Sequence, residues 1–155
     1  MLSNKEFLFN AEQRLKKMQE AKSKVVVVGV LDGVYDDGTS VAEVAIAHEY
    51  GTKDLSQRSF LRNSVIEKEE RIDDVINSEF SHALDNNDYS IDKALGRVGL
   101  EVVNIVKFSF RENGYGTWEP LKSDYFDKKM KRDRNLTLIY SGKLRDSIKS
   151  EVRNG

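Results

Sequence analysis

The feature that most constrains the fold is a run of β-branched residues, Val25–Val28, which continues through Gly29 to Leu31. β-Branched side chains favour extended backbone, and a run this short is typical of a buried strand rather than of a helix. Before the run, apolar residues recur at steps of three and four and predict a helix over about 4–21. Ser3 and Glu6 have the spacing of a capping box, which would begin that helix.

Two longer segments also have helical periodicity. In the first, about 63–85, apolar residues repeat mostly every four positions, and in the second, about 91–111, they form the clearest amphipathic stripe of the chain. The second segment carries Leu100, Val103, Phe108 and Phe110 on its other side, which predicts that it is covered on more than one face. Residues 149–153 are expected to form a terminal strand.

These elements predict an α+β fold, in which a small, mostly antiparallel sheet packs against two long amphipathic helices. No internal repeat and no linker rich in Gly, Pro or Ser divides the chain. We therefore expect a single domain over 1–155, with the N-terminal helix of 1–22 at its periphery.

The stretch Val41–Arg62 reads VAEVAIAHEYGTKDLSQRSFLR. Ser40 has the right position to cap a short apolar helix, and Gly51 is expected to end that helix with a positive φ. Later in the chain, Pro120 is predicted to begin a further helix, and Ser141 to cap a helix over 142–148. Nothing in Val41–Arg62 is arranged for chemistry, which favours a role in assembly.

Composition fits one soluble domain with a core of moderate size, since 39% of the 155 residues are hydrophobic and 33% are charged. There is no cysteine, which excludes disulfides and thiolate metal ligands. The formal net charge of −1 gives no overall attraction to nucleic acid or to anionic membranes. The apolar runs are far shorter than the roughly 20 residues of a membrane helix, and the charged N-terminal segment is unlike a secretory signal. Neither membrane insertion nor export is expected.

Charge is unevenly distributed along the chain. Residues 67–92 hold nine acidic residues against Lys68 and Arg71, whereas residues 122–153 hold ten Lys or Arg against five acidic residues. One interpretation is two solvated helix faces of opposite sign. The other is a head-to-tail contact, in which the acidic face of one copy meets the basic face of its neighbour.

Candidate catalytic and metal sites fail on spacing. His48-Glu49 begins like a zinc-protease helix, but position 52 is a threonine and His82 is the one other histidine, so His48 is expected to be a partly buried histidine bonded to its surroundings. The acidic residues of 32–37 lack calcium-loop spacing, the glycines nearby lack the Gly-Lys-Ser/Thr of a phosphate loop, and no serine stands in a Gly-x-Ser-x-Gly elbow. The sequence predicts no catalytic residue, metal or cofactor, and hence no enzyme.

A basic cluster leaves a second function open. Lys128, Lys129 and Arg132 stand near Tyr125 and Phe126, and such clusters bind phosphates without sequence preference. No helix-turn-helix, zinc-finger or RNA-binding aromatic motif accompanies them. A small nucleic-acid-binding module using the surface of 128–134 is therefore the alternative function.

The order of motifs resembles the tail-completion or neck proteins of tailed bacteriophages, of the minor tail protein Z type. The resemblance covers the chain from about Val25 onward. It is carried by DGTSVAEVA at 37–45, HEYGT at 48–52, RSFLR at 58–62, Pro120-Leu121, and LIYSGKLRDSI at 138–148.

The resemblance implies a structural virion protein that completes the tail or joins it to the head. Such proteins form homo-oligomeric rings, here expected to be hexameric, that contact other neck, connector or tail proteins and touch channel DNA at most non-specifically. The implied location is the tail or neck of the virion, after assembly in the host bacterial cytoplasm. The candidate interface residues on this basis are Glu49, Tyr50, Arg58, Phe60, Arg62, Lys128, Lys129, Arg132, Leu144 and Arg145.

Two interpretations of the RSFLR segment stay open. Arg58 and Arg62 could each make forked bonds to carboxylates of a partner, with Phe60 filling a pocket between them. Alternatively, the trio is intramolecular, with Arg58 bound to Glu49 or a backbone carbonyl and Phe60 in the core.

Overall fold

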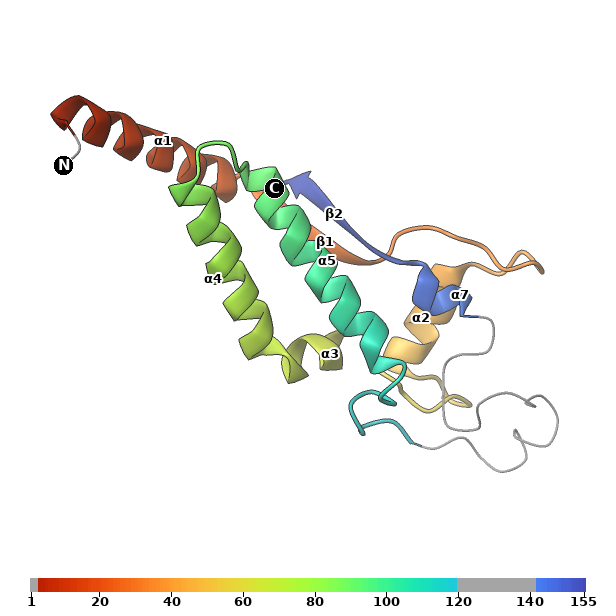
Figure 1. Cartoon of the computed structure of the whole chain (residues 1–155). Helices are drawn as coiled ribbons and strands as arrows, with labels where there is room; N and C mark the ends of the chain where they lie inside the picture. The colour runs from red at the N-terminus through yellow and green to blue at the C-terminus, as the bar shows by residue number, and fades with distance from the viewer. Residues whose placement is uncertain (1–2, 120–141) are drawn as a thin grey trace. The chain divides into compact units, whose positions relative to one another are not determined.

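The computed structural model describes residues 3–119 and 142–155 (Figure 1). Its two strands pair as one antiparallel sheet, and most of the other described residues are helical, which confirms the predicted α+β class. The elements are α1 Asn4–Lys22, β1 Lys24–Val30, α2 Val41–Tyr50, α3 Arg62–Glu67, α4 Glu69–Asp85, α5 Ile91–Ser109, α7 Lys143–Asp146 and β2 Ile148–Asn154.

The chain divides into two compact units, each built from segments distant in sequence. The first comprises Met1–Val28, Glu70–Glu101 and Ser150–Gly155, and the second comprises Gly29–Glu69 and Val102–Lys149. The interpretation of 1–155 as one domain stays a prediction.

In the first unit, α1 begins where the sequence predicts. The Ser3 hydroxyl accepts a hydrogen bond from the Glu6 amide at 3.3 Å, and the Glu6 carboxylate accepts one from the Ser3 amide at 2.8 Å, so the capping box is confirmed. The helix buries none of its residues completely. The Lys17 ammonium binds α1 to the unit by donating hydrogen bonds to the carbonyls of Ala83, Asn86 and Tyr89 at 2.6, 2.6 and 3.1 Å.

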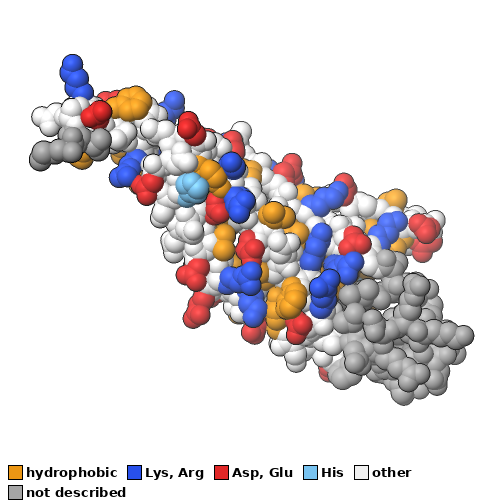
Figure 2. Space-filling model, viewed as in Figure 1, with side chains coloured by type: hydrophobic (Ala, Val, Ile, Leu, Met, Phe, Trp, Pro, Cys, Tyr) orange, Lys and Arg blue, Asp and Glu red, His pale blue; other side chains and the backbone are white. Residues whose placement is uncertain are grey.

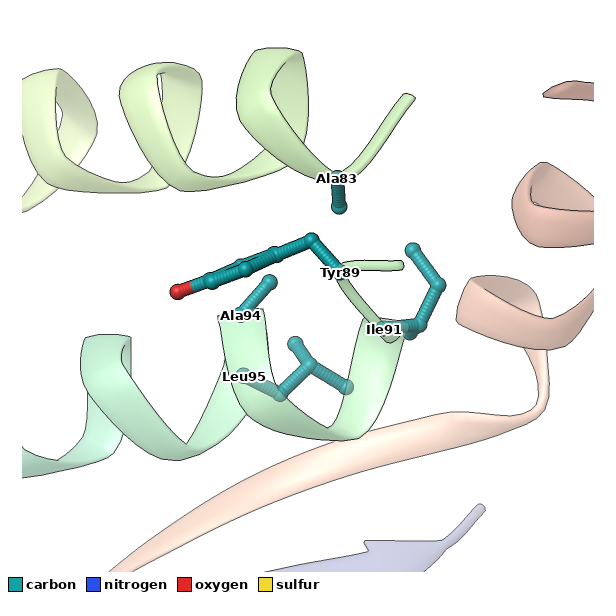
Figure 3. Close-up of a cluster of buried hydrophobic side chains, with 5 residues drawn as sticks. All are labelled: Ala83, Tyr89, Ile91, Ala94 and Leu95. Atoms are coloured by element: carbon teal, nitrogen blue, oxygen red, sulfur yellow. The ribbon is translucent and has the colours of Figure 1, made fainter. Parts of the chain in front are cut away.

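The core of the first unit lies between the end of α4 and the start of α5. Figure 3 shows the ring of Tyr89 between Ala83 of α4 and Ala94 of α5, with Ile91 and Leu95 nearby. Val26 of β1 and Val152 of β2 pack against this cluster from the sheet.

A glycine sets the approach of α5 to the sheet. A Cβ at Gly99 would lie 2.9 Å from Ser150 and 3.0 Å from Val26, so the helix backbone rests directly on both strands. The packing of the small sheet against a long helix thus depends on the missing side chain.

The second unit has an aromatic core. Phe60, which is completely buried, lies with its ring centroid 5.3 Å from that of Phe110, and Phe110 meets Trp118 edge to face at 5.7 Å. Val41 and Ala45 of α2 are also buried.

Several local predictions need correction. The helix predicted over about 63–85 is broken at Lys68, whose φ of −122° and ψ of 23° separate α3 from α4. Strand β1 is half-buried rather than buried, with Val25 exposed. Ser40 makes no capping hydrogen bond to α2. On α5, Val103 is buried, but Leu100 and Phe108 are exposed.

Other predictions are confirmed, and two concern residues that the structure does not describe. Gly51 has a φ of 75° at the end of α2, and β2 contains the predicted terminal strand. The helix predicted from Pro120 and the cap at Ser141 lie outside the described residues. Within the described residues, no helix combines the length and the apolar character that crossing a membrane requires.

A buried carboxylate at the candidate interface

The candidate interface of the second unit is organised by the end of α2. Gly51 ends the helix, and a Cβ at this position would lie 3.1 Å from the backbone nitrogen of Gln57. The chain then returns to α2, where the Arg58 amide donates to the His48 carbonyl at 2.7 Å and the Gln57 side chain donates to the Glu49 carbonyl at 3.0 Å. These bonds satisfy the carbonyls that a helix end leaves without partners.

The side chain of Glu49 is the centre of this segment. Its Oε1 accepts from the Ser59 hydroxyl at 2.7 Å and from the amide and Nε of Arg62 at 3.1 and 3.0 Å, and its Oε2 accepts from the Leu61 amide at 2.9 Å. Leu61, the residue before α3, has no side chain that could cap that helix. Glu49 therefore supplies the cap from another helix.

The charge of Glu49 is stabilised although the residue is buried. Burial raises the pKa of the carboxyl. The hydrogen bonds from Ser59, Leu61 and Arg62 together lower the pKa by more than burial raises it, so the pKa lies below its ordinary value. The positive end of α3 points at the same carboxylate. Glu49 is thus an ionised anchor for two helices, because its hydrogen bonds together outweigh the effect of burial on its pKa.

His48 is half-buried, as predicted, but not bonded as predicted. Its Nδ1 is buried and has no hydrogen-bond partner among the described residues. Burial, together with the nearby charge of Arg58, lowers the pKa of His48. No group of three or more metal-binding side chains occurs among residues 3–119 and 142–155.

The RSFLR segment follows the intramolecular interpretation at Phe60. Phe60 is in the core, and Arg58 is buried at 6% exposure, so neither side chain faces solvent for a partner to contact. The carboxylate of Glu49 is bound by Arg62 of the same chain. Glu49, Arg58 and Phe60 are thus buried in the described structure of the unit, and their contact with a partner stays a prediction.

The exposed part of the candidate interface is a stacked pair. The Arg62 guanidinium lies 4.6 Å from the ring centroid of Tyr50, and Tyr50 is 62% exposed. Ile46, one turn earlier on α2, is also exposed. Ile46 was not predicted from the sequence, although its position four residues before Tyr50 puts both on one helix face.

The remaining candidates are divided. Leu144 of α7 is buried, whereas Arg145 is partly exposed and pairs with its neighbour Asp146 at 2.9 Å. Lys128, Lys129 and Arg132 lie outside the described residues. The structure thus brings Glu49, Tyr50, Arg58, Phe60 and Arg62 together, and it does not test the basic cluster.

Comparison of the chain with protein-family models, with curated proteins and with solved structures finds no match in any of the three.

Proposed function

We propose that this chain is a structural virion protein of a tailed phage, which completes the tail or joins it to the head as a homo-oligomeric ring. The observation that carries the proposal is the closure of two motif segments, 48–52 and 58–62, around the carboxylate of Glu49. These are the segments whose sequence resembles the phage neck proteins. Their contacts fix the geometry of a surface rather than prepare a reaction.

The surface that this closure presents has the chemistry of a protein contact. Tyrosine and arginine are enriched among residues that dominate binding energy, and Tyr50 and Arg62 are stacked and exposed. Arg62 is held in place by Glu49, so less side-chain entropy is lost when a partner binds. Ile46 adds apolar area beside them.

Charge supports a head-to-tail arrangement of copies. Glu70, Asp73 and Asp74 of α4 are exposed, and none of them makes an ion pair among the described residues. An acidic face of this kind attracts the basic segment 122–153 of a neighbouring copy, which gives a heterologous contact that closes into a ring.

Sizing of the purified protein tests the ring. We expect an assembly larger than a dimer, which Tyr50→Glu disrupts. Val34→Glu is the matched control, because Val34 is exposed to a similar degree and bridges to Ser40 at the start of α2, at the opposite end of that helix from Tyr50. A wild-type chain that never exceeds two copies, alone or with other virion proteins, would contradict the ring.

The place in the particle needs a phage experiment. A stop codon in the gene that encodes this chain is expected to leave heads and tails unjoined or tails incomplete, and a mass census of wild-type particles should contain the chain. Fully infectious particles without it would refute the proposal. Measuring DNA affinity across salt concentrations distinguishes the ring protein from the alternative, a nucleic-acid-binding module. A monomer that binds DNA strongly and in a salt-dependent manner would favour the alternative.

A further inference from the structure

We propose that α1 pairs with the α1 of a second copy of this chain in an antiparallel, two-fold symmetric contact. This surface is separate from Tyr50 and Arg62, and the inference does not depend on the ring.

The helix turns its polar side toward its own chain. The half-buried residues of α1 recur at helical spacing, and four of the six are polar: Asn10, Ala11, Gln13, Lys17, Glu20 and Ala21. Lys17 donates three hydrogen bonds to backbone carbonyls of the first unit, and Arg14 pairs with Asp85 at 2.6 Å. Hydrogen bonds and an ion pair therefore attach α1 to the unit, together with the packing of Ala21 against the core.

The apolar side of α1 is left in solvent. Phe7, Leu8, Leu15 and Met18 are 64, 60, 59 and 50% exposed. Hydrophobic side chains reach the surface at the N-terminal end of the molecule on the face shown in Figure 2. An amphipathic helix normally buries such a stripe, and none of the described residues covers it, so we infer a partner for this side of α1.

The spacing of the stripe fits a second helix. Leu8, Ala11, Leu15 and Met18 follow one another at steps of three, four and three, which is the a and d pattern of a coiled coil. The pattern is symmetric about Gln13, the midpoint of the 19-residue helix Asn4–Lys22. Reversing a second copy therefore places Leu8 against Met18 and Ala11 against Leu15 while the two helices overlap along their whole length.

The ends of the helix favour antiparallel over parallel pairing. In a parallel pair, Lys22 would occupy the next a position and face the same ammonium of the other copy. In the antiparallel pair, Lys22 faces Asn4, a neutral polar residue that cannot repel it. The reversed orientation thus removes the one charge conflict in the seam.

Charge beside the seam is also complementary. Glu12 and Lys16 lie on the same flank of the stripe, and neither makes an ion pair or hydrogen bond among the described residues. In the antiparallel pair, Glu12 of one copy lies within a turn of Lys16 of the other, and the two-fold axis repeats this contact. The two Glu12 side chains also lie within a turn of each other, so two attractive contacts accompany one repulsive contact. The two lysines then bracket the two glutamates.

The contact is small. Covering the four large apolar side chains on both helices would bury on the order of 1,000 Å² in total, at the low end for specific interfaces. We therefore expect micromolar affinity. Sedimentation should be measured at protein concentrations up to about 100 μM.

The first test is Leu15→Glu in the full chain. It places a charge in the middle of the seam and should halve the mass of the wild-type assembly, whatever that mass is. Leu100→Glu is the matched control, because it replaces a leucine of α5 that is 57% exposed, close to the value for Leu15. An unchanged mass in Leu15→Glu refutes the pairing, and Tyr50→Glu reports the ring separately.

A mixing experiment tests the charges. Glu12→Lys carries two cations on the flank and Lys16→Glu carries two anions, so each variant alone should pair at least tenfold more weakly than wild type. Mixed in equal amounts, the two should regain pairing, because the charges then alternate across the seam. Failure of the mixture to associate better than either variant contradicts the arrangement.

Cross-linking tests the orientation of the two helices. Because the chain has no native cysteine, any disulfide must form between the introduced cysteines. Asn4→Cys mixed with Lys22→Cys should form a disulfide-linked dimer, whereas Asn4→Cys alone should not, because its two thiols would lie about 28 Å apart. Rapid dimerisation of Asn4→Cys alone would refute the antiparallel pair. Binding of a monomeric wild-type chain to anionic vesicles, abolished by Leu15→Glu, would assign the stripe to a lipid surface and overturn the proposal.

Discussion

The carboxylate of Glu49 lies 2.7 Å from the hydroxyl of Ser59, and this bond ties the last turn of α2 to the residues that begin α3. Ser59 is itself buried, and its hydroxyl oxygen in turn accepts from the Asn63 amide at 3.4 Å. The pair is thus the midpoint of a chain of hydrogen bonds that runs from one helix into the next.

Replacing Glu49 should destabilise the chain strongly. Glu49→Ala leaves the Ser59 hydroxyl and the amides of Leu61 and Arg62 without their acceptor, so we expect a loss of about 3 kcal/mol in the free energy of unfolding. Urea unfolding measures it. Glu43→Ala, an exposed change on the same helix, is the control and should cost under about 0.5 kcal/mol. Equal losses in both variants would show that the buried bonds contribute nothing.

Stability should also fall in acid because of Glu49. Its pKa in the folded chain lies below the ordinary value of 4.5, so in the range between the two values the unfolded chain binds a proton that the folded chain does not. The stabilisation is therefore present above about pH 4.5 and is lost as pH falls. Urea titrations at pH 5.5 to 3.0 should show a shallower decline for Glu49→Gln than for the wild type.

His48 predicts a second pH dependence at higher pH. Burial and the Arg58 charge lower the pKa of His48 from 6.5, so below pH 6.5 the unfolded chain takes up a proton that the folded chain resists. The free energy of unfolding should therefore decrease as pH falls from 6.5 to 5. His48→Gln should flatten this part of the curve, and a slope identical to that of the wild type would contradict the assignment.

Gly51 should not tolerate a side chain. Its φ of 75° is strained for other residues, and an added Cβ would press on the backbone of Gln57, so Gly51→Ala should cost about 2 kcal/mol in thermal or urea unfolding. Gly38→Ala separates the two causes, because Gly38 has a φ of 84° with nothing within 4 Å of the added atom. It should cost only about 1 kcal/mol.

Two glycines of α5 should respond with opposite signs. Gly99→Ala forces the helix away from Ser150 and Val26 and should cost about 2 kcal/mol, whereas at Gly96 the added atom meets nothing within 4 Å. Gly96→Ala should therefore stabilise the chain by about 0.5–1 kcal/mol through helix propensity. Thermal unfolding of the two variants measures both changes in stability. A stabilised Gly99→Ala variant would show that the helix does not rest on the sheet.

Lys17 should control the attachment of α1. Lys17→Met removes three hydrogen bonds to carbonyls of the first unit, and we expect α1 to lose about 2 kcal/mol of protection in amide hydrogen exchange of dilute protein. Lys5→Met, on the exposed start of the same helix, is the control and should leave the exchange of α1 unchanged.

Local patterns of sequence predicted most helices and both strands, because caps and periodicity are local properties. The box of Ser3 and Glu6 began α1 as expected, and Gly51 ended α2. The break at Lys68 was not predictable in this way, since no glycine or proline marks it. Lys68 instead places its ammonium 4.5 Å from the ring centroid of Tyr115, a contact that depends on tertiary structure.

Part of the candidate site lies in segments that the sequence singled out, but its arrangement was not predicted. The motif segments contain both Glu49 and Arg62, but the residue types alone could not show that the carboxylate is buried and binds Arg62 within the chain. The apolar stripe of α1 shows the same limit. Periodicity predicted the helix, whereas the side that it turns to the chain was decided by Lys17 and Arg14.

The bonds to Glu49 span only ten to thirteen residues. Closing so short a loop costs little chain entropy and takes well under a microsecond, whereas the contact of Phe60 with Phe110 must wait for a far longer loop. On a ribosome, the hydrogen bonds to Glu49 are therefore able to form before Phe110 has been synthesised.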